Sequence, residues 1–238
     1  MSSPPEYRDA QAAPRPADAA RAAPPSGRTR IRRIPENARY ETATVHAIID
    51  AALVCHVAFA DAAGVHCIPT ACWRQGNGLH IHGSNGSRLI RALQSGAAAA
   101  VTITLVDGLV LARSAFNHSM NYRSVVAYGV FSTMPDAAKP ALLAAFLEHL
   151  VPGRQGQVRA GDGNELAATT VLRLDLAEAA AKVRTGPPQD DAADLGWPVW
   201  AGVLPLQLVP GPAQVDASCA LPAPENIRAW TQRRFDAG

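Results

Sequence analysis

The sequence predicts a mainly β fold of the α+β class, in which six antiparallel strands close into a small barrel with helices at its periphery. Six segments either alternate apolar and polar residues or are rich in β-branched residues, and both patterns are typical of strands. The connections between these segments are tight turns or short helices, which favours antiparallel neighbours. Closing such a set into a barrel removes the unpaired edges of a sheet.

The composition limits the class of protein and its partners. A chain of 238 residues is long enough for one well-buried domain, and no apolar run reaches the length of a membrane span. The formal net charge of +2 is too small to indicate nucleic-acid binding. Four cysteines without a C-x-x-C pair and without a secretion signal favour reduced thiols. We therefore expect a cytoplasmic protein with neither nucleic acid nor membrane as a partner.

Three regions differ in their patterning. Residues 1–34 are rich in proline and alanine without sustained periodicity, which predicts a disordered or loosely attached tail. Residues 35–208 contain all the periodic segments and form the predicted domain, including an extended arm near its end. Residues 209–238 are a C-terminal extension.

The domain begins with a predicted helix and a hairpin. From Thr42 to Ala52 the apolar residues follow a helical stripe. Segments 53–59 and 65–73 then alternate with period two across a short turn, which predicts a hairpin. Pro69 has no backbone N–H, so its strand must lie at an edge, carry a bulge, or face a ligand at that point.

Residues 79–93, LHIHGSNGSRLIRAL, predict a strand, a turn and a helix that is suited to binding an anion. The turn and the first helical residues supply two hydroxyls, from Ser84 and Ser87, and the guanidinium of Arg88. A helix N-terminus offers unpaired N–H groups, and arginine can bind phosphate through two hydrogen bonds. The alternative is an ordinary capped helix with a solvated arginine.

Further strands are predicted at 99–111, 123–131 and 169–176, with a polar segment at 112–122 between the first two. The apolar stripe after Pro135 predicts a helix that ends at Pro152.

Beyond the last predicted strand, residues 182–188 read as a basic loop. The apolar, proline-rich segment 197–210 cannot form a long helix or a central strand. It predicts an extended arm in which Trp197 and Trp200 bury large areas.

Four segments together carry a resemblance to a known family. HGSNGSRLIRAL, DGLVLARSAFNHSMNYRSVVAYG (107–129), KVRTGPP and WAGVLPL, in this order, resemble the flavin-nucleotide-binding branch of the pyridoxamine 5'-phosphate oxidase-like proteins, which is related to the nitroimidazole-resistance proteins. The similarity spans roughly residues 35–208. It implies an FMN-binding split β-barrel that forms a homodimer, with FMN in each of two clefts between the subunits.

The resemblance also implies which residues bind the cofactor. The isoalloxazine ring is expected along one strand, and the phosphate near a strand end and the following helix start. A further strand start is expected to line the cleft from this subunit or its partner, and a basic loop to hold an anionic substrate or the phosphate. Trp200 is expected either to stack near the ring or to pack in the dimer. The residues expected along the ring are Ile68, Pro69 and Thr70, and those expected near the phosphate are His82, Gly83, Ser84, Ser87 and Arg88. The strand start that lines the cleft is Asn121, Tyr122 and Arg123, and the basic loop supplies Lys182 and Arg184.

Other readings of the polar residues stay open. His118 is the candidate catalytic residue, as a proton donor to a substrate of the reduced flavin, although it can also be an ordinary loop histidine. Arg113 and Asp107 can form an ion pair, and Arg123 can be a solvated charge at a strand edge. His80 and His82 share one side of a strand, but no third ligand is evident, so no metal site is predicted.

The expected function is that of an FMN-binding oxidoreductase, which passes electrons or hydride from reduced FMN to a small organic acceptor. One alternative is a haem-binding or haem-degrading protein on the same barrel, with His80, His82 or His118 near the iron. The other is a flavin-binding module without catalytic activity.

Overall fold

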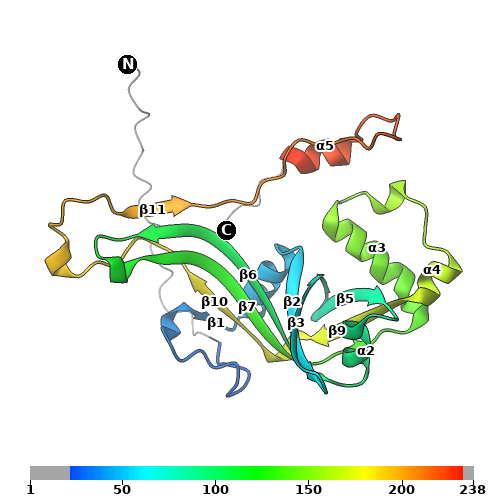
Figure 1. Cartoon of the computed structure of the whole chain (residues 1–238), viewed down its shortest axis with the longest axis horizontal. Helices are drawn as coiled ribbons and strands as arrows, with labels where there is room; N and C mark the ends of the chain where they lie inside the picture. The colour runs from blue at the N-terminus through cyan, green and yellow to red at the C-terminus, as the bar shows by residue number, and fades with distance from the viewer. Residues whose placement is uncertain (1–21, 233–238) are drawn as a thin grey trace.

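The computed structural model of the protein describes residues 22–232 and contains two antiparallel sheets around one main hydrophobic core (Figure 1). The larger sheet has the strand order β1-β10-β7-β6-β2-β3, and β11 pairs with β6. The smaller sheet has the order β4-β5-β9-β8. The strands are β1 Ala38–Arg39, β2 Val54–Asp61, β3 Gly64–Ala71, β4 Trp73–Gln75, β5 Gly78–Ser84, β6 Ala98–Leu111, β7 Ser119–Val130, β8 Ser132–Thr133, β9 Thr169–Asp175, β10 Ala179–Arg184 and β11 Gly202–Pro205.

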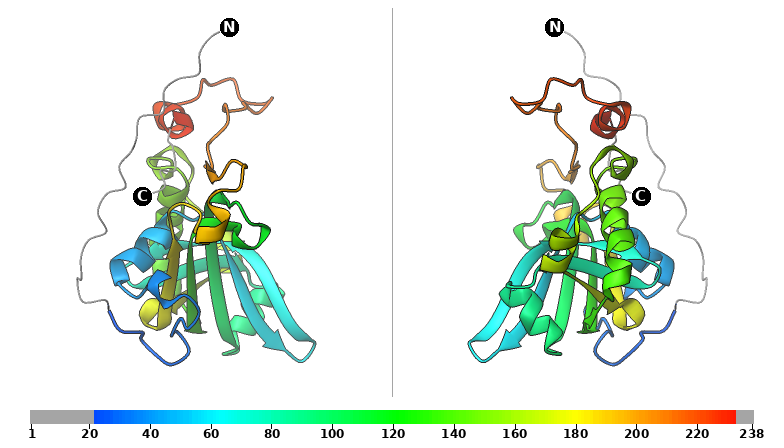
Figure 2. Two further views of the ribbon diagram at one scale, coloured as in Figure 1. Left: turned by 90° about the vertical axis from the view of Figure 1, so that its left-hand side faces the viewer. Right: turned by 90° about the vertical axis from the view of Figure 1, so that its right-hand side faces the viewer.

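The helices are short and lie around the sheets. Figure 2 shows α1 and the β2–β3 hairpin at opposite sides of the molecule, while α3 packs on the smaller sheet. No helix among residues 22–232 is long and apolar enough to cross a membrane. The α-helices are α1 Thr42–Asp50, α2 Arg88–Gln94, α3 Lys139–Leu150, α4 Gly163–Ala168 and α5 Glu225–Gln232; the 3₁₀ helices are η1 Pro35–Asn37, η2 Ala115–Asn117, η3 Asp136–Ala138, η4 Gln155–Gln157, η5 Leu176–Glu178 and η6 Ala192–Asp194.

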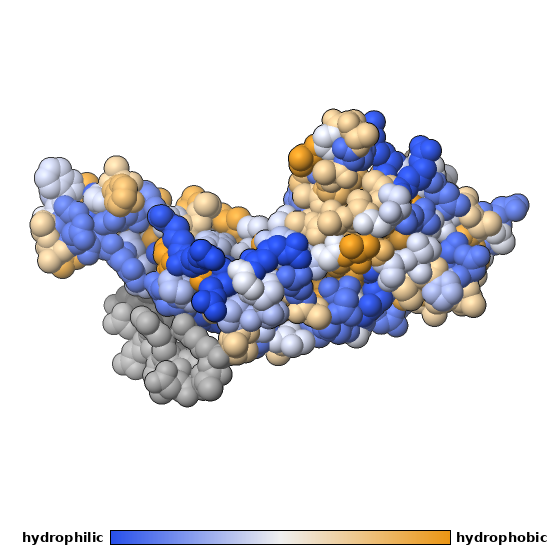
Figure 3. All heavy atoms as spheres, turned by 90° about the horizontal axis from the view of Figure 1, so that it is seen from below, coloured by the Kyte–Doolittle hydropathy of each residue, from blue (hydrophilic) through white to orange (hydrophobic). Residues whose placement is uncertain are grey.

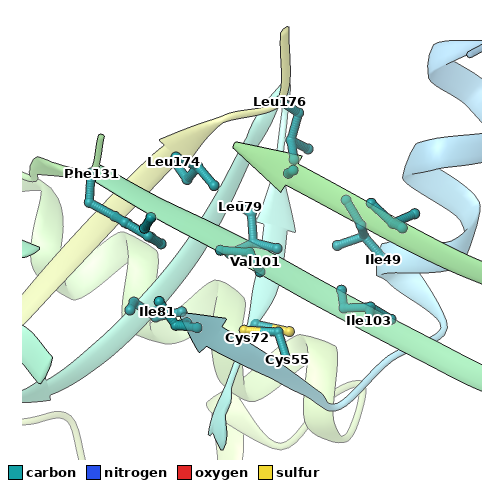
Figure 4. Packing of buried hydrophobic residues seen from close by; sticks show 14 of the residues in the cluster. Ile49, Cys55, Cys72, Leu79, Ile81, Val101, Ile103, Phe131, Leu174 and Leu176 are labelled. Carbon is teal, nitrogen blue, oxygen red and sulfur yellow. The ribbon is translucent and has the colours of Figure 1, made fainter. Parts of the chain in front are cut away.

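The core lies on the inner face of the larger sheet and is closed by the smaller sheet and two helices. Figure 4 shows side chains from β2, β5, β6, β9 and α1 meeting there, among them Cys55, Ile81 and Val101. Every second residue is buried in β2 from Cys55 to Phe59 and in β6 from Ala99 to Ile103, and the intervening residues, which are exposed or partly exposed, form an outer face. The period-two pattern in the sequence therefore corresponds to one buried face and one exposed face.

The predicted fold class is confirmed, and the number of strands is larger than the predicted six. The predicted strands correspond to β2, β3, β5, β6, β7 and β9. The segment 65–73 is divided between β3 and β4, which belong to different sheets, and β7 begins at Ser119 inside the predicted polar segment.

The basic loop predicted at 182–188 is wrong for its first residues. Lys182 and Arg184 lie in β10, which is paired with β7 along its whole length. The alanine-rich sequence of this strand has low intrinsic strand propensity, so its conformation depends on the pairing.

The described part of the predicted N-terminal tail packs against the barrel. Thr29 is buried, and Arg28 forms an ion pair with Glu178 at 2.6 Å. The guanidinium of Arg28 also lies over the ring of Tyr128, 4.5 Å from its centroid. Arg28 and Thr29, which the sequence analysis assigns to the tail, therefore contact the rest of the described chain. Residues 1–21 of the predicted tail and 233–238 of the predicted extension lie outside the described residues.

The predicted extended arm is present, and its two tryptophans are exposed in the single chain. Residues Gly202–Pro205 form β11 at the edge of β6, and the backbone N–H of Leu206 donates to the carbonyl of Asp107. Trp197 and Trp200 are 64% and 68% exposed, so they do not bury the large areas expected of them within one chain.

We predict that Leu172→Ala will destabilise the protein by about 2–5 kcal/mol, because the side chain of Leu172 is fully buried in the core and its removal leaves a cavity. Leu221→Ala is the matched control, since Leu221 is 73% exposed. Urea denaturation of both variants measures the difference. Equal free energies of unfolding would contradict the position of Leu172 in the core.

Candidate functional site

The turn between β5 and α2 contains the predicted anion-binding residues and is held by its own hydrogen bonds. The backbone N–H of Ser87 donates to the carbonyl of Ser84 at 2.9 Å, and Asn85 fastens the turn by donating to the carbonyl of Ala167 at 2.7 Å. At Gly83 a Cβ would lie 3.0 Å from Cγ1 of Ile90, so a larger residue would push the strand end away from α2. The predicted strand, turn and helix are therefore present.

Arg88 begins α2, is exposed, and forms no hydrogen bond or ion pair with another described residue. The pKa of the Asp61 carboxyl lies below its usual value, mainly because His66 bonds to it at 2.8 Å, and the nearby charge of Arg88 is a smaller cause. The neighbouring Arg91 differs, because its guanidinium donates to the carbonyl of Gly86 at 3.0 Å. The guanidinium of Arg88 is thus available to an anionic ligand.

Strand β3 carries the residues predicted to lie along the isoalloxazine ring. It pairs with β2 on one side and forms the edge of the larger sheet on the other, as Pro69 requires. The side chain of Ile68 packs against the core, and Pro69 is exposed on the outer face. The ring-binding assignment therefore depends on backbone groups at the free edge and on Pro69, not on the side chain of Ile68.

A second group of predicted residues lies side by side on β7 and β10. Tyr122 is paired with Arg184, and Arg123 with Val183. The guanidinium of Arg184 donates to the side-chain oxygen of Asn121. The side-chain nitrogen of Asn121 donates to the carbonyl of Gly186 at 3.2 Å.

Lys182 is paired with Ser124, in the row next to that of Val183 and Arg123. Its Nζ donates to the carbonyl of Arg33 at 3.0 Å. In the single chain, Lys182 therefore binds a backbone carbonyl and Arg184 binds a side-chain amide, so both cations have partners within the protein.

Two ion pairs differ from the expected pair of Arg113 and Asp107. Asp107 lies at a bulge of β6 and binds Arg123 through both carboxylate oxygens, at 2.8 and 3.0 Å, which raises the pKa of Arg123. Arg113 instead binds Asp190 at 2.9 Å. Arg123 is consequently a fixed, half-buried charge and not a solvated one at a strand edge.

The far end of the β6–β7 ribbon carries His118. Its Nδ1 donates to the carbonyl of Ser114 at 2.9 Å, which leaves Nε2 as the acceptor nitrogen of the exposed ring. Trp200 precedes β11 beside the same end of the ribbon and is exposed.

The two groups of predicted residues are not brought together within one chain. Along β6, the position paired with Phe59 of β2 is Ala99, and the position paired with Asn121 of β7 is Gly108. At about 3.3 Å per residue these rows are roughly 30 Å apart. Arg88 lies near Asp61, beyond Phe59, so the β5–α2 turn and the group around Asn121 form separate surfaces of one chain.

His80 and His82 lie in the interior, between the smaller sheet and α3. The ring of His80 stacks on Trp73 with centroids 5.5 Å apart, and the ring of His82 lies 4.7 Å from that of Phe146. The Nδ1 atoms of both histidines and Nε1 of Trp73 are buried without a hydrogen-bond partner. His82, assigned to the cofactor from the sequence, therefore contacts aromatic side chains in this chain.

His56 and Cys67 were not assigned a role from the sequence. Both are exposed on the outer face of the larger sheet, where His56 is paired with Pro69. The alternation of β2 was the available signal, because buried Cys55 and Val57 on either side place His56 on the opposite face.

Two antiparallel sheets around one core, with a free edge strand and an exposed arginine at a hydroxyl-rich turn, define a split-barrel protein with a candidate anion site. The chain belongs to the pyridoxamine 5'-phosphate oxidase family, whose profile of that description matches residues 41–183. No match was found among curated proteins.

Among the solved structures that resemble this chain, two share more than 30% of its residues and cover most of it. The flavocytochrome Anf3 from Azotobacter vinelandii is 39% identical, with a TM-score of 0.83 over 88% of this chain and 99% of that chain. The FAD and heme binding protein from Mycobacterium smegmatis is 34% identical, with a TM-score of 0.78 over 84% of this chain and 98% of that one.

We predict that the free energy of unfolding will fall as the pH is lowered below about 6.5, the pKa of an unfolded histidine. Burial lowers the pKa of His80 and of His82, so the unfolded chain takes up these protons first. Their contribution is fully present above the unfolded pKa and is lost as the pH falls toward the folded pKa. Urea denaturation between pH 7.5 and 5.5 measures it. The double variant His80→Phe/His82→Phe should show a flatter profile, and an unchanged profile would contradict this account.

Proposed function

We propose that the protein binds a flavin nucleotide and acts as an oxidoreductase, passing electrons or hydride from the reduced flavin to a small organic acceptor. The observation that carries this proposal is the 39% identity to a flavocytochrome over 88% of the chain. A bound flavin supplies the redox chemistry, and the chain's own residues bind and orient it.

Features of the β5–α2 turn and of β3 fit a flavin nucleotide. Arg88 has no partner in the described chain and stands beside the hydroxyls of Ser84 and Ser87, so it supports phosphate binding at this turn. The free edge of β3 offers unpaired backbone groups to the rim of a planar heterocycle, and Pro69 has no N–H to leave unsatisfied there.

We infer that the flavin is FAD. The resemblance found in the sequence predicts FMN, whereas the similar protein from Mycobacterium smegmatis is named for FAD. Both nucleotides share the ring and the first phosphate, so Arg88 and the β3 edge serve either of them. A titration with each nucleotide decides between them.

The complete site belongs to a homodimer. The group around Asn121 is roughly 30 Å from the β5–α2 turn in one chain, so a second subunit is needed to bring both groups to one flavin. Figure 3 shows the molecule from below the view of Figure 1, and on this face hydrophobic side chains are interspersed with hydrophilic ones. Large exposed apolar side chains are present at the ribbon end, which favours that end for subunit contact; they include Val106, Met120, Trp197, Trp200 and Leu204.

Haem is a second candidate cofactor, bound in addition to the flavin. Both similar full-length structures are named for haem or cytochrome as well as flavin. Of the histidines named from the sequence, His80 and His82 are enclosed by aromatic rings and only His118 is exposed. Haem binding at the first two would require the smaller sheet and α3 to separate.

The first test is a titration of the purified protein with FAD and with FMN, followed by quenching of flavin fluorescence. We expect saturable binding, tighter for FAD, and a loss of about 1.5–3 kcal/mol in Arg88→Ala, because a charged hydrogen bond to phosphate is removed. Arg154→Ala, in the loop after α3, is the control and should bind as the wild type does. Unchanged affinity in folded Arg88→Ala would remove the phosphate assignment, and tighter FMN binding would restore the prediction of FMN. Binding of flavin without turnover with any reductant would indicate a flavin-binding module.

For the homodimer, we expect sedimentation equilibrium to give twice the mass of the 25.0 kDa chain. Trp200→Glu should shift the mass toward the monomer, because it places a charge among the exposed apolar residues of the ribbon end. Leu221→Glu, at an equally exposed position outside that end, is the control. A wild-type monomer, or a dimer indifferent to Trp200→Glu, would oppose this arrangement.

A further inference from the structure

The chain has seven histidines, all within the described residues. Three of them use Nε2 in hydrogen bonds of 2.8–3.1 Å, namely His46 with Asn77, His66 with Asp61 and His149 with the carbonyl of Ala52. His80 and His82 are packed against Trp73. Two exposed imidazoles with an available nitrogen are left, those of His56 and His118.

His56 stands on the outer face of the larger sheet among small, uncharged side chains. Its cross-strand neighbours are Pro69 on β3 and Thr102 on β6. The next row on the same face has Ala58 between Cys67 and Ala100. Side chains of a strand stand roughly perpendicular to the sheet, so the imidazole of His56 rises above a low and largely apolar surface. We call these six residues the His56 platform.

The shape and chemistry of the platform suit a planar, apolar ligand with a coordinating metal. A macrocycle can lie parallel to the sheet above alanine, threonine and proline side chains, because none of them projects as far as the imidazole. His56 forms no hydrogen bond or ion pair within the described chain, so its ring is free to turn a nitrogen toward an iron atom. Neutral imidazole is a common axial ligand of haem.

We propose that His56 is the axial ligand of a haem that lies on the His56 platform. This inference rests on the proposed function, in which haem accompanies the flavin. The platform reaches the edge strand β3 through Cys67 and Pro69, and His56 lies on the neighbouring strand, paired directly with Pro69. A haem on the platform and a flavin at the edge of β3 would thus be neighbours in the same subunit.

His118 is the weaker candidate for this role. Ser119, next to it in the chain, is paired with Val110 of β6, eight positions from Thr102, which is about 26 Å at strand spacing. The ion pair of Arg113 and Asp190 lies near this end of the ribbon, so the surroundings of His118 are more polar than the platform. A haem there would also be distant from β3 of its own subunit.

The experiment is a titration of the full-length protein with haemin, followed by the Soret band in the oxidised and reduced states. We expect His56→Ala to weaken haem binding by about 10- to 100-fold or more, because even the loss of a hydrogen-bond partner of a metal ligand typically costs that much. His56→Thr, which retains strand propensity, should weaken haem binding in the same way. Added imidazole should restore a wild-type Soret position in His56→Ala. His118→Ala and His46→Ala, at histidines outside the platform, should bind haem as the wild type does.

Flavin titration of each variant reports separately whether it is folded. Wild-type haem affinity and a wild-type spectrum in folded His56→Ala or His56→Thr would overturn the assignment. Loss of haem in His118→Ala, with His56→Ala unaffected, would overturn it as well. If the wild type takes up flavin but shows no Soret band with haemin, both this inference and the haem part of the proposed function fail, while the flavin part stands. If haem binds and only the His56 variants lose it, the assignment is supported.

Discussion

Strand β6 pairs with β7 along most of its length, with β2 at its start and with β11 at its end, and this shared pairing organises the molecule. One face of β6 supplies Val101 and Ile103 to the core, so the register of its partners decides which of their residues are buried. The bulge at Asp107 shifts that register once. It also places a carboxylate against Arg123 and a carbonyl under the N–H of Leu206, which links the ribbon to the arm.

The same long ribbon separates the polar residues that would otherwise form one site. The β5–α2 turn and the edge of β3 lie at the barrel, while Asn121 and His118 are carried toward the far end of the ribbon. In the homodimer proposed above, a cofactor site would draw one half from the barrel of one subunit and the other half from the ribbon of its partner. The apolar residues at the ribbon end are consistent with such a contact.

Sequence periodicity was enough to predict the long strands, the β2–β3 hairpin and the β5–α2 turn, because each carries a strong local pattern. Strand β10 was missed, since alanines have little strand preference and only the pairing with β7 makes them extended. Helix α4 begins with a capping box of Asp162 and Glu165, which is a local signal from which a helix start can be predicted. The partners of Arg113 and Asp107 depended on a bulge and on a distant loop, and neither can be located from local sequence. The burial of His80 and His82 likewise came from α3, far along the chain.

The contacts of residues 22–34 have a practical consequence for anyone who trims the chain for expression. A fragment that began at residue 35 would remove Arg28, leaving Glu178 without its cation and Tyr128 without the guanidinium above its ring. It would also remove the carbonyl that accepts from Lys182 and the N–H of Ile31 that donates to the hydroxyl of Tyr40. Shortened versions should therefore retain Ser26 to Arg33, because these residues contact the domain.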